Sequence, residues 1–186
     1  MLQVTWEWIG IDEPALDVAN TVAISGGVPH DLLEPSGEYE RWAAAAAASP
    51  AVDADAGRAL RGARRRVLAL REPIRAVLFA TAAGERLPGA AVAELNRASR
   101  RAPAWVEVAH SGELREHVGG DAADRLLARY ARSAMKIAAA GPERLRACPA
   151  PSCGMLYRPT RRDQHWCSRQ CGTRARVARH YAATRR

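Results

Sequence analysis

Apolar residues recur at the spacing of an α-helix along most of the first 140 positions. The longest such pattern covers residues 53–83, where Leu60, Val67 and Ile74 belong to one apolar stripe and Gly84 ends the stretch. Pro73 lies inside this stretch, and we expect a kink or a break there. The same spacing predicts further helices over residues 12–24, over 36–48, from Pro88 to the Arg100–Pro103 breaker, and from an Asp121 cap to Gly141.

Alternation of apolar and polar residues is confined to short segments. Val4–Ile9 alternates and predicts a strand, while Trp105–His110 and Glu113–Val118 flank a Ser-Gly turn and predict a β-hairpin. Gly141-Pro142 marks a domain boundary. The expected fold class is therefore α+β, mainly α, with a helical N-terminal domain over 1–141, a few short strands, and a small C-terminal module over 144–186. No apolar run approaches the roughly 18 residues of a membrane span, so we expect no membrane partner.

All four cysteines of the chain lie in the C-terminal module, spaced as Cys148-x4-Cys153-x13-Cys167-x3-Cys171. Two close pairs separated by a dozen or so residues are what one tetrahedral zinc ion requires. We expect each pair in a tight turn and a hairpin in the segment between the pairs. Ser168 is a suitable N-cap for a helix that carries Cys171 on its first turn. A knuckle, a hairpin and a helix N-terminus form a treble-clef-like zinc finger.

Two disulfides, or four unrelated thiols, are the alternatives to zinc. The first ten residues lack the basic and apolar segments of a signal peptide, so we expect a cytoplasmic location, in which thiols stay reduced and bind metal. Four thiolate ligands leave no open position for a catalytic water, so the sequence predicts one structural Zn²⁺. The five histidines are scattered, and neither a Ser-His-acid set nor a phosphate-binding glycine loop is present. We therefore expect no enzymatic activity.

The net charge of +8 is concentrated at one end of the chain. Residues 144–186 contain eleven arginines and a single acidic residue, Asp163, while the remainder is slightly acidic. Such segregation indicates a polyanionic partner, for which nucleic acid is the commonest choice. The candidate contacts on the predicted C-terminal helix are Arg169, Arg174, Arg176, Arg179 and His180.

Other interpretations of the basic module remain open. Arg174 can equally serve local packing beside the metal. The module can bind RNA, with the Trp166 and Tyr157 rings stacked on bases, or it can act as a protein-interaction adaptor with a purely structural zinc. The arginine content also reflects a general preference in this chain, since Lys136 is its only lysine.

Residues 16–21, Leu-Asp-Val-Ala-Asn-Thr, place Asp17, Asn20 and Thr21 on one face of the first predicted helix. A polar group of this kind can line a small-molecule pocket or fasten a buried hydrogen-bond network. Because the opposite arc of the helix is apolar, the pattern by itself favours a third interpretation, the solvent-exposed face of an amphipathic helix.

Several segments resemble a known family. Residues 144–148, 153–154, 165–168, 171–174 and 179–181 are similar to the CGNR zinc finger, and residues 16–21 are similar to the opening motif of the ABATE domain that precedes it. The resemblance covers nearly the whole chain. It implies a stress-induced transcription regulator, in which a DNA-binding zinc finger is joined to a sensing domain. Our hypothesis for the N-terminal domain is that it senses a small-molecule effector or forms a homodimer. Thr173 stands where the family has Asn, so the bidentate contact that an amide makes with adenine is not available there.

Overall fold

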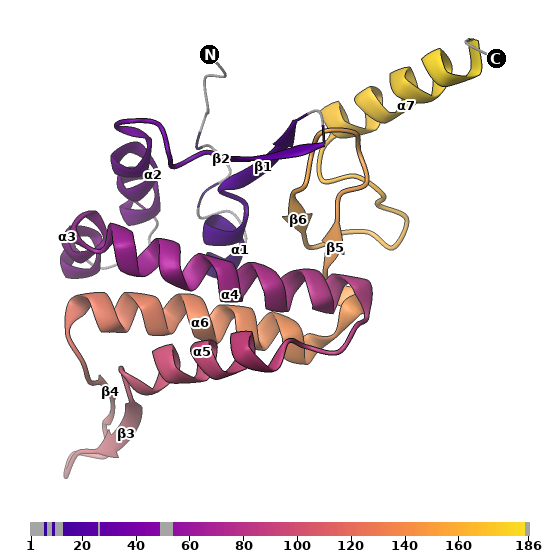
Figure 1. Ribbon diagram of the computed structural model, residues 1–186. Helices are drawn as coiled ribbons and strands as arrows, with labels where there is room; N and C mark the ends of the chain where they lie inside the picture. The colour runs from indigo at the N-terminus through magenta and orange to yellow at the C-terminus, as the bar shows by residue number, and fades with distance from the viewer. Residues whose placement is uncertain (1–5, 7–8, 10–12, 26, 49–53, 185–186) are drawn as a thin grey trace.

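The body of the molecule is a bundle of helices built around α4 (Arg64–Ala83) and α6 (Ala122–Ala140), which lie along each other (Figure 1). The remaining helices of the bundle pack on these two or on each other: α1 (Pro14–Ala19), α2 (Glu38–Ala47), α3 (Ala54–Gly62) and α5 (Gly89–Arg100). The structure is a computed structural model that describes residues 6, 9, 13–25, 27–48 and 54–184. The mainly helical fold class expected from the sequence is confirmed.

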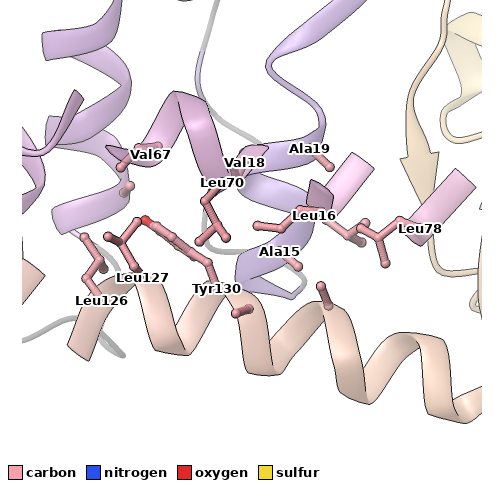
Figure 2. Packing of buried hydrophobic residues seen from close by; sticks show 14 of the residues in the cluster. Ala15, Leu16, Val18, Ala19, Val67, Leu70, Leu78, Leu126, Leu127 and Tyr130 are labelled. Carbon is pink, nitrogen blue, oxygen red and sulfur yellow. The ribbon is translucent and has the colours of Figure 1, made fainter. Parts of the chain in front are cut away.

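Helix α1 is short but central to the packing. Its Leu16 and Val18 are 3% and 1% exposed, and they point toward Leu70 of α4 and Tyr130 of α6 (Figure 2). Trp42 of α2 faces inward as well: its ring is fully buried, and its Nε1 donates to the Asp17 carbonyl at 3.1 Å. Burial of each such large side chain contributes about 2–3 kcal/mol, so α1 is held mainly by its apolar residues.

The first predicted helix is too long. Helix α1 ends at Ala19, and the chain continues as β1 (Val22–Ser25), which pairs antiparallel with β2 (Val28–Asp31). The Thr21 hydroxyl donates to the Val18 carbonyl at 2.8 Å, and the β-branched residues that follow favour an extended backbone. The strand predicted over Val4–Ile9 lies largely outside the described residues.

The helix pattern over residues 53–83 is not broken at Pro73. The chain divides at Ala63, between α3 and α4, and α4 continues through Pro73. A proline inside a helix costs about 3 kcal/mol. Here Leu70, Ile74 and Val77 are buried on either side of Pro73, so packing against the bundle outweighs that cost.

The predicted hairpin is confirmed as β3 (Ala104–Val108) and β4 (Leu114–Val118), paired with Trp105 opposite His117. It projects from the bundle beside the end of α5 (Figure 1). Its two rings stack at a centroid distance of 5.3 Å, and the Trp105 Nε1 donates to Glu107.

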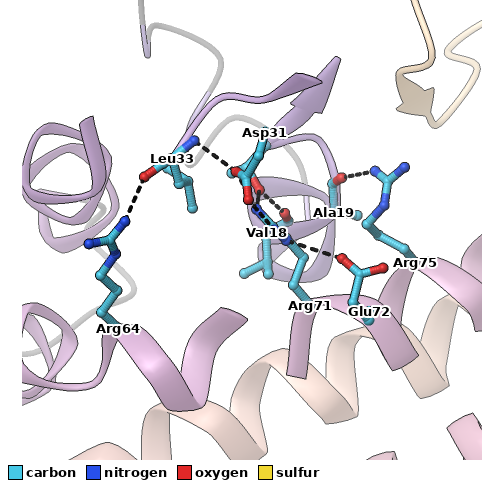
Figure 3. A network of polar contacts seen from close by, with 9 residues as sticks. Val18, Ala19, Asp31, Leu33, Arg64, Arg71, Glu72 and Arg75 are labelled. Carbon is cyan, nitrogen blue, oxygen red and sulfur yellow. Dashed lines mark hydrogen bonds and ion pairs between the residues drawn. The ribbon is translucent and has the colours of Figure 1, made fainter. Parts of the chain in front are cut away.

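A partly buried ion pair joins β2 to α4 (Figure 3). The Arg71 guanidinium donates to both carboxylate oxygens of Asp31, at 2.8 and 2.6 Å, and to the Thr21 hydroxyl at 3.2 Å. Burial raises the pKa of the Asp31 carboxyl, but the hydrogen bonds from Arg71 and from the Leu33 N–H outweigh burial, and the net pKa is lowered. Asp31 is therefore ionised in the folded protein at neutral pH.

The C-terminal module follows α6 through a 3-10 turn, η1 (Pro142–Arg144). It consists of the antiparallel strands β5 (Arg146–Ala147) and β6 (Leu156–Tyr157), a loop, and α7 (Arg169–Thr184). Leu145 and Leu156 are 0% and 2% exposed because they pack into the core of the body. Helix α7 leads away from the body (Figure 1).

Candidate zinc centre and nucleic-acid interface

The first cysteine pair lies in the turn that joins β5 to β6. The Cys148 N–H donates to the Met155 carbonyl at 2.8 Å, which closes this turn. Ser152 and Gly154 flank Cys153, and both have a left-handed backbone, with φ of 57° and 68°. The hairpin of the module therefore encloses the first cysteine pair. The prediction of a hairpin between the two pairs is wrong, because residues 158–168 contain no strand.

The second pair is set by the start of α7. Cys167 precedes the helix and Cys171 lies on its first turn, where the Cys171 N–H donates to the Ser168 hydroxyl at 3.2 Å. The N-cap role predicted for Ser168 is therefore confirmed. Close packing of the Trp166 ring explains the glycine at position 172, because a Cβ there would lie 3.0 Å from the ring.

The four sulfur atoms converge on one point in the module. All four lie within 4.8 Å of one another, and three of the Sγ–Sγ distances, among Cys153, Cys167 and Cys171, are 3.5 or 3.6 Å. A disulfide requires a separation of about 2.05 Å, so the cysteines are not bridged. A regular tetrahedron with Zn–S bonds of about 2.3 Å has edges of about 3.8 Å, and the observed spacing fits that geometry. The cysteines thus form a site for one structural zinc.

The electrostatics of the cluster also suit a metal cation. A hydrogen bond with the Cys167 thiol lowers the pKa of Cys153 below its ordinary value, which favours the thiolate form that binds metal. The same hydrogen bond raises the pKa of Cys167, and burial raises the pKa of Cys148. A zinc ion would replace the shared protons and hold all four sulfurs as thiolates.

The predicted nucleic-acid residues are distributed along α7. All five are exposed, and beyond Ala175 no described residue of the helix is buried. Arg176 donates to the Thr173 hydroxyl at 3.0 Å and Arg179 donates to the Ala175 carbonyl at 3.4 Å, so both side chains lie along the helix surface. The Arg174 guanidinium instead turns back to the cysteine cluster, where it donates to Cys171 Sγ and to the Ser152 carbonyl.

The two rings considered for stacking on RNA bases have internal contacts. Tyr157 is 7% exposed, and its hydroxyl donates to the Gln164 carbonyl at 3.0 Å. Trp166 packs against Gly172 on the first turn of α7 and is partly buried.

Asn20 connects the body to the zinc module. Its amide nitrogen donates to the Leu156 carbonyl at 2.9 Å, and its amide oxygen accepts from the Leu156 N–H at 2.8 Å. The Asn20 side chain thus acts as a strand partner for β6. The contact spans 136 positions of sequence, and no local pattern marks it.

Two further contacts support this junction, and sequence reasoning did not identify either of them. The Ile24 N–H donates to the Cys153 carbonyl at 3.4 Å, and this bond joins the end of β1 to the β5–β6 turn. Glu13 accepts from Arg158 of the module at 2.8 Å and from Ser133 of α6 at 3.1 Å. These contacts fix the position of the zinc module on the body.

The polar residues of the 16–21 segment are not a solvent-exposed face. Asp17, Asn20 and Thr21 are 7%, 5% and 0% exposed, so that interpretation is wrong and the segment forms a buried hydrogen-bond network. The helix ends before Thr21, and the zinc module covers Asn20. A cleft of about 810 Å³ lies along this junction, and Asp17 and Asn20 are among its lining residues. Thr21 does not line it.

The fold and the cysteine cluster define a class of protein, a helical domain joined to a four-cysteine zinc finger. Residues 12–141 match the model of the ABATE family, described as "Putative stress-induced transcription regulator", and residues 144–184 match the CGNR zinc finger. The chain belongs to this family, and the resemblance drawn from the sequence is confirmed. It is therefore a transcription-regulator family member with one structural zinc.

A search of curated proteins finds no match to the chain. Among the described residues, no helix has both the length and the apolar character that a bilayer-spanning segment needs.

Proposed function

We propose that this chain regulates transcription by binding DNA through α7. The observation that supports this most directly is the exposure of an acid-free, arginine-rich helix that extends away from the body (Figure 1). Arg169, Arg176, Arg179 and His180 are the proposed contacts, and they neutralise phosphates on the duplex backbone. The site of action is the cytoplasm, where the four thiols stay reduced. Catalysis is not part of the proposal, because a zinc ion with four thiolate ligands has no open position.

The test is the salt dependence of binding to a fluorescein-labelled mixed-sequence duplex of 30 base pairs, followed by anisotropy. Phosphate contacts release counterions, so we expect the affinity to fall steeply as salt rises from 50 to 200 mM. Arg176→Ala and Arg179→Ala should each reduce the slope of log K against log salt by about 1.

The matched control is Arg97→Ala, which removes an exposed arginine of α5 that is paired with Glu94 on the body. It should leave both the affinity and the slope unchanged. A flat salt response in the wild-type protein would contradict DNA binding. Competition by a single-stranded RNA of equal length that exceeds competition by the duplex would favour the RNA interpretation instead.

A second part of the proposal assigns effector sensing to the cleft between the body and the zinc finger. The cleft is of the size that small ligands occupy, and a ligand there would contact Asp17 of the body together with Arg158 of the finger. Ligand-observed NMR with a library of small organic acids and amines tests this. Binders should be lost in Ala23→Trp, which fills the cleft, and retained in Ala139→Trp on the far side of the bundle. If no compound in the library binds the wild type and Ala139→Trp but fails to bind Ala23→Trp, the sensing role is contradicted.

Homodimer formation is the third part of the proposal. Five large apolar side chains of the β3–β4 hairpin are 46–70% exposed, and a second copy would cover them. Light scattering during gel filtration should give a dimer for the wild type and a monomer for Val106→Lys. Val28 on β2 has the same 56% exposure as Val106, so Val28→Lys is the control and should remain dimeric. A wild-type monomer would contradict this part.

A further inference from the structure

Arg174 is directed toward the cysteine cluster, although it belongs to the exposed basic helix. Its Nη2 lies 3.3 Å from Cys171 Sγ, and its Nη1 lies 3.0 Å from the Ser152 carbonyl oxygen. Cys171 is on the first turn of α7, whereas Ser152 immediately precedes Cys153 in the β5–β6 turn. One side chain therefore joins the two halves of the zinc site.

We infer that Arg174 is a positioning residue of the zinc centre, which holds the β5–β6 turn against α7 and stabilises the Cys171 thiolate. This inference rests on the zinc site and not on DNA binding. Arg174 thereby leaves the set of predicted nucleic-acid contacts.

Charge favours this role. Four thiolates around Zn²⁺ carry two net negative charges, and a guanidinium that donates to one sulfur compensates part of that excess. A charge-assisted N–H···S hydrogen bond withdraws electron density from the sulfur, so the sulfur is protonated less readily and stays available to the metal. Groups that hydrogen-bond to metal ligands in this way typically change metal affinity 10–100-fold.

The conformation of Ser152 supports the second contact. Among the described residues it is the only one other than glycine with a positive φ, at 57°. A left-handed conformation is unfavourable for a residue with a side chain, and it persists where surrounding contacts hold it. The hydrogen bond from Arg174 to the Ser152 carbonyl is such a contact, and it fixes the backbone that places Cys153.

The neighbouring arginine provides a matched control. Arg176 lies two positions further along α7 and donates to the Thr173 hydroxyl at 3.0 Å, and among the described residues it makes no hydrogen bond to a cysteine. Both side chains are exposed and both carry one positive charge. A difference between their substitutions therefore reports on contact with the zinc site and not on overall charge.

Zinc transfer from the full-length, zinc-loaded protein to 4-(2-pyridylazo)resorcinol tests the inference. We expect Arg174→Ala to lose zinc about tenfold faster than the wild type, and Arg176→Ala to match the wild type. Arg174→Lys should be intermediate, because an ammonium group keeps the charge but cannot donate in a fork to both acceptors.

A spectroscopic measurement separates stabilisation of the thiolate from a general loosening of the fold. In protein reconstituted with Co²⁺, the thiolate-to-cobalt charge-transfer band should shift in Arg174→Ala and in Arg174→Lys, and should not shift in Arg176→Ala. Since the lysine variant retains the charge, it serves if the alanine variant does not fold. Equal zinc transfer and equal bands in the Arg174 and Arg176 variants would overturn the inference. So would a loss of DNA affinity in Arg174→Ala with unchanged zinc transfer, which would identify a phosphate contact.

Discussion

At the scale of single residues, polar side chains of the 16–21 segment form hydrogen bonds with two different parts of the molecule. Thr21 accepts from Arg71 of the body, and Asn20 pairs with the backbone of Leu156 in the zinc module. Their burial follows from these partners, since a buried polar group is stable only where it is hydrogen-bonded. The segment is therefore the point where the ion-pair network of the body meets the zinc finger.

Asn20→Ala should destabilise the full chain by about 3 kcal/mol, because it leaves both the N–H and the carbonyl of buried Leu156 without a partner. Urea denaturation followed by circular dichroism measures this change. Asn96, the only other asparagine in the chain, lies on α5 and is partly exposed, so Asn96→Ala is the control and should change stability by less than about 0.5 kcal/mol. Equal effects of the two substitutions would show that the Asn20 hydrogen bonds contribute nothing measurable.

Asp31→Asn should lower stability in a manner that depends on pH. The folded-state pKa of Asp31 is lowered, so the ion pair contributes its full stability above about pH 4, the ordinary value for a carboxyl group, and loses it as pH falls through the folded-state pKa. At pH 7 the variant removes the closer carboxylate partner of buried Arg71 and leaves it only Glu72, 3.4 Å from its Nε, at a cost of about 2 kcal/mol. Urea unfolding at pH 7 and pH 3 should therefore show a difference in the free energy of unfolding between variant and wild type that is smaller at pH 3 than at pH 7.

The zinc site also loosens in acid, but it is common to both proteins and cancels in this comparison. Asp163→Asn, which changes an exposed carboxylate of the zinc-finger loop, is the control and should alter stability little at either pH. If the free energies of unfolding of the wild type and Asp31→Asn differ by the same amount at both pH values, the stabilising role assigned to the Asp31–Arg71 ion pair is wrong.

At the scale of elements, the junction between β1 and the β5–β6 turn depends on close backbone approach. A Cβ added at Gly154 would lie 2.3 Å from Ile24 Cγ1, well inside van der Waals contact. Gly154 also has a φ of 68°, which favours glycine. The glycine after Cys153 therefore allows both the turn around the zinc site and its docking on β1.

Gly154→Ala should lower the free energy of unfolding by more than the replacement of a glycine with positive φ costs by itself. The control is Gly112→Ala in the β3–β4 turn, where φ is 83° and an added Cβ would meet nothing within 4 Å. We expect Gly112→Ala to cost about 1–2 kcal/mol of stability. Gly154→Ala should cost more and should also accelerate tryptic cleavage within residues 158–168. The double variant Gly154→Ala/Ile24→Ala should recover part of the loss, and its failure to do so would exclude the clash as the cause.

At the scale of the whole molecule, the sequence predicts elements more readily than their junctions. The helices of the bundle and the β3–β4 hairpin follow from periodicity, and the zinc site follows from cysteine spacing, because each pattern is local. Where packing competes with a local signal, the local signal does not decide, as at Pro73, which lies inside α4 and does not break the helix. The β1–β2 pair is local, since Ser25 lies opposite Val28, and the Gly26-Gly27 dipeptide between them is a hairpin signal that the prediction of a long helix overlooked. The Asn20 contact instead depends on Leu156, 136 positions away, and no window of sequence contains both halves.

The burial of Leu145 and Leu156 in the core of the body determines how the molecule should respond to loss of zinc. Residues up to Leu145 belong to a core that does not contain the metal, whereas α7 has only three buried residues, all on its first two turns, to hold it. An isolated helix of this length is marginal in water. Chelation with EDTA should therefore unfold the loop and α7 while the bundle remains folded.

Hydrogen exchange measured by mass spectrometry on the full chain tests this expectation. Amides of α7 should lose protection on chelation or in Cys153→Ser, while the amides of α4 and α6 keep theirs, because their hydrogen bonds open only with the apolar core. Restoring zinc should restore protection to the wild type and not to Cys153→Ser, which retains only three of the four thiolates. Equal loss of protection in α4 and α7 would instead mean that the body and the finger unfold as one cooperative unit. In that case the Asn20 and Glu13 contacts would couple the body and the finger so strongly that neither unfolds without the other.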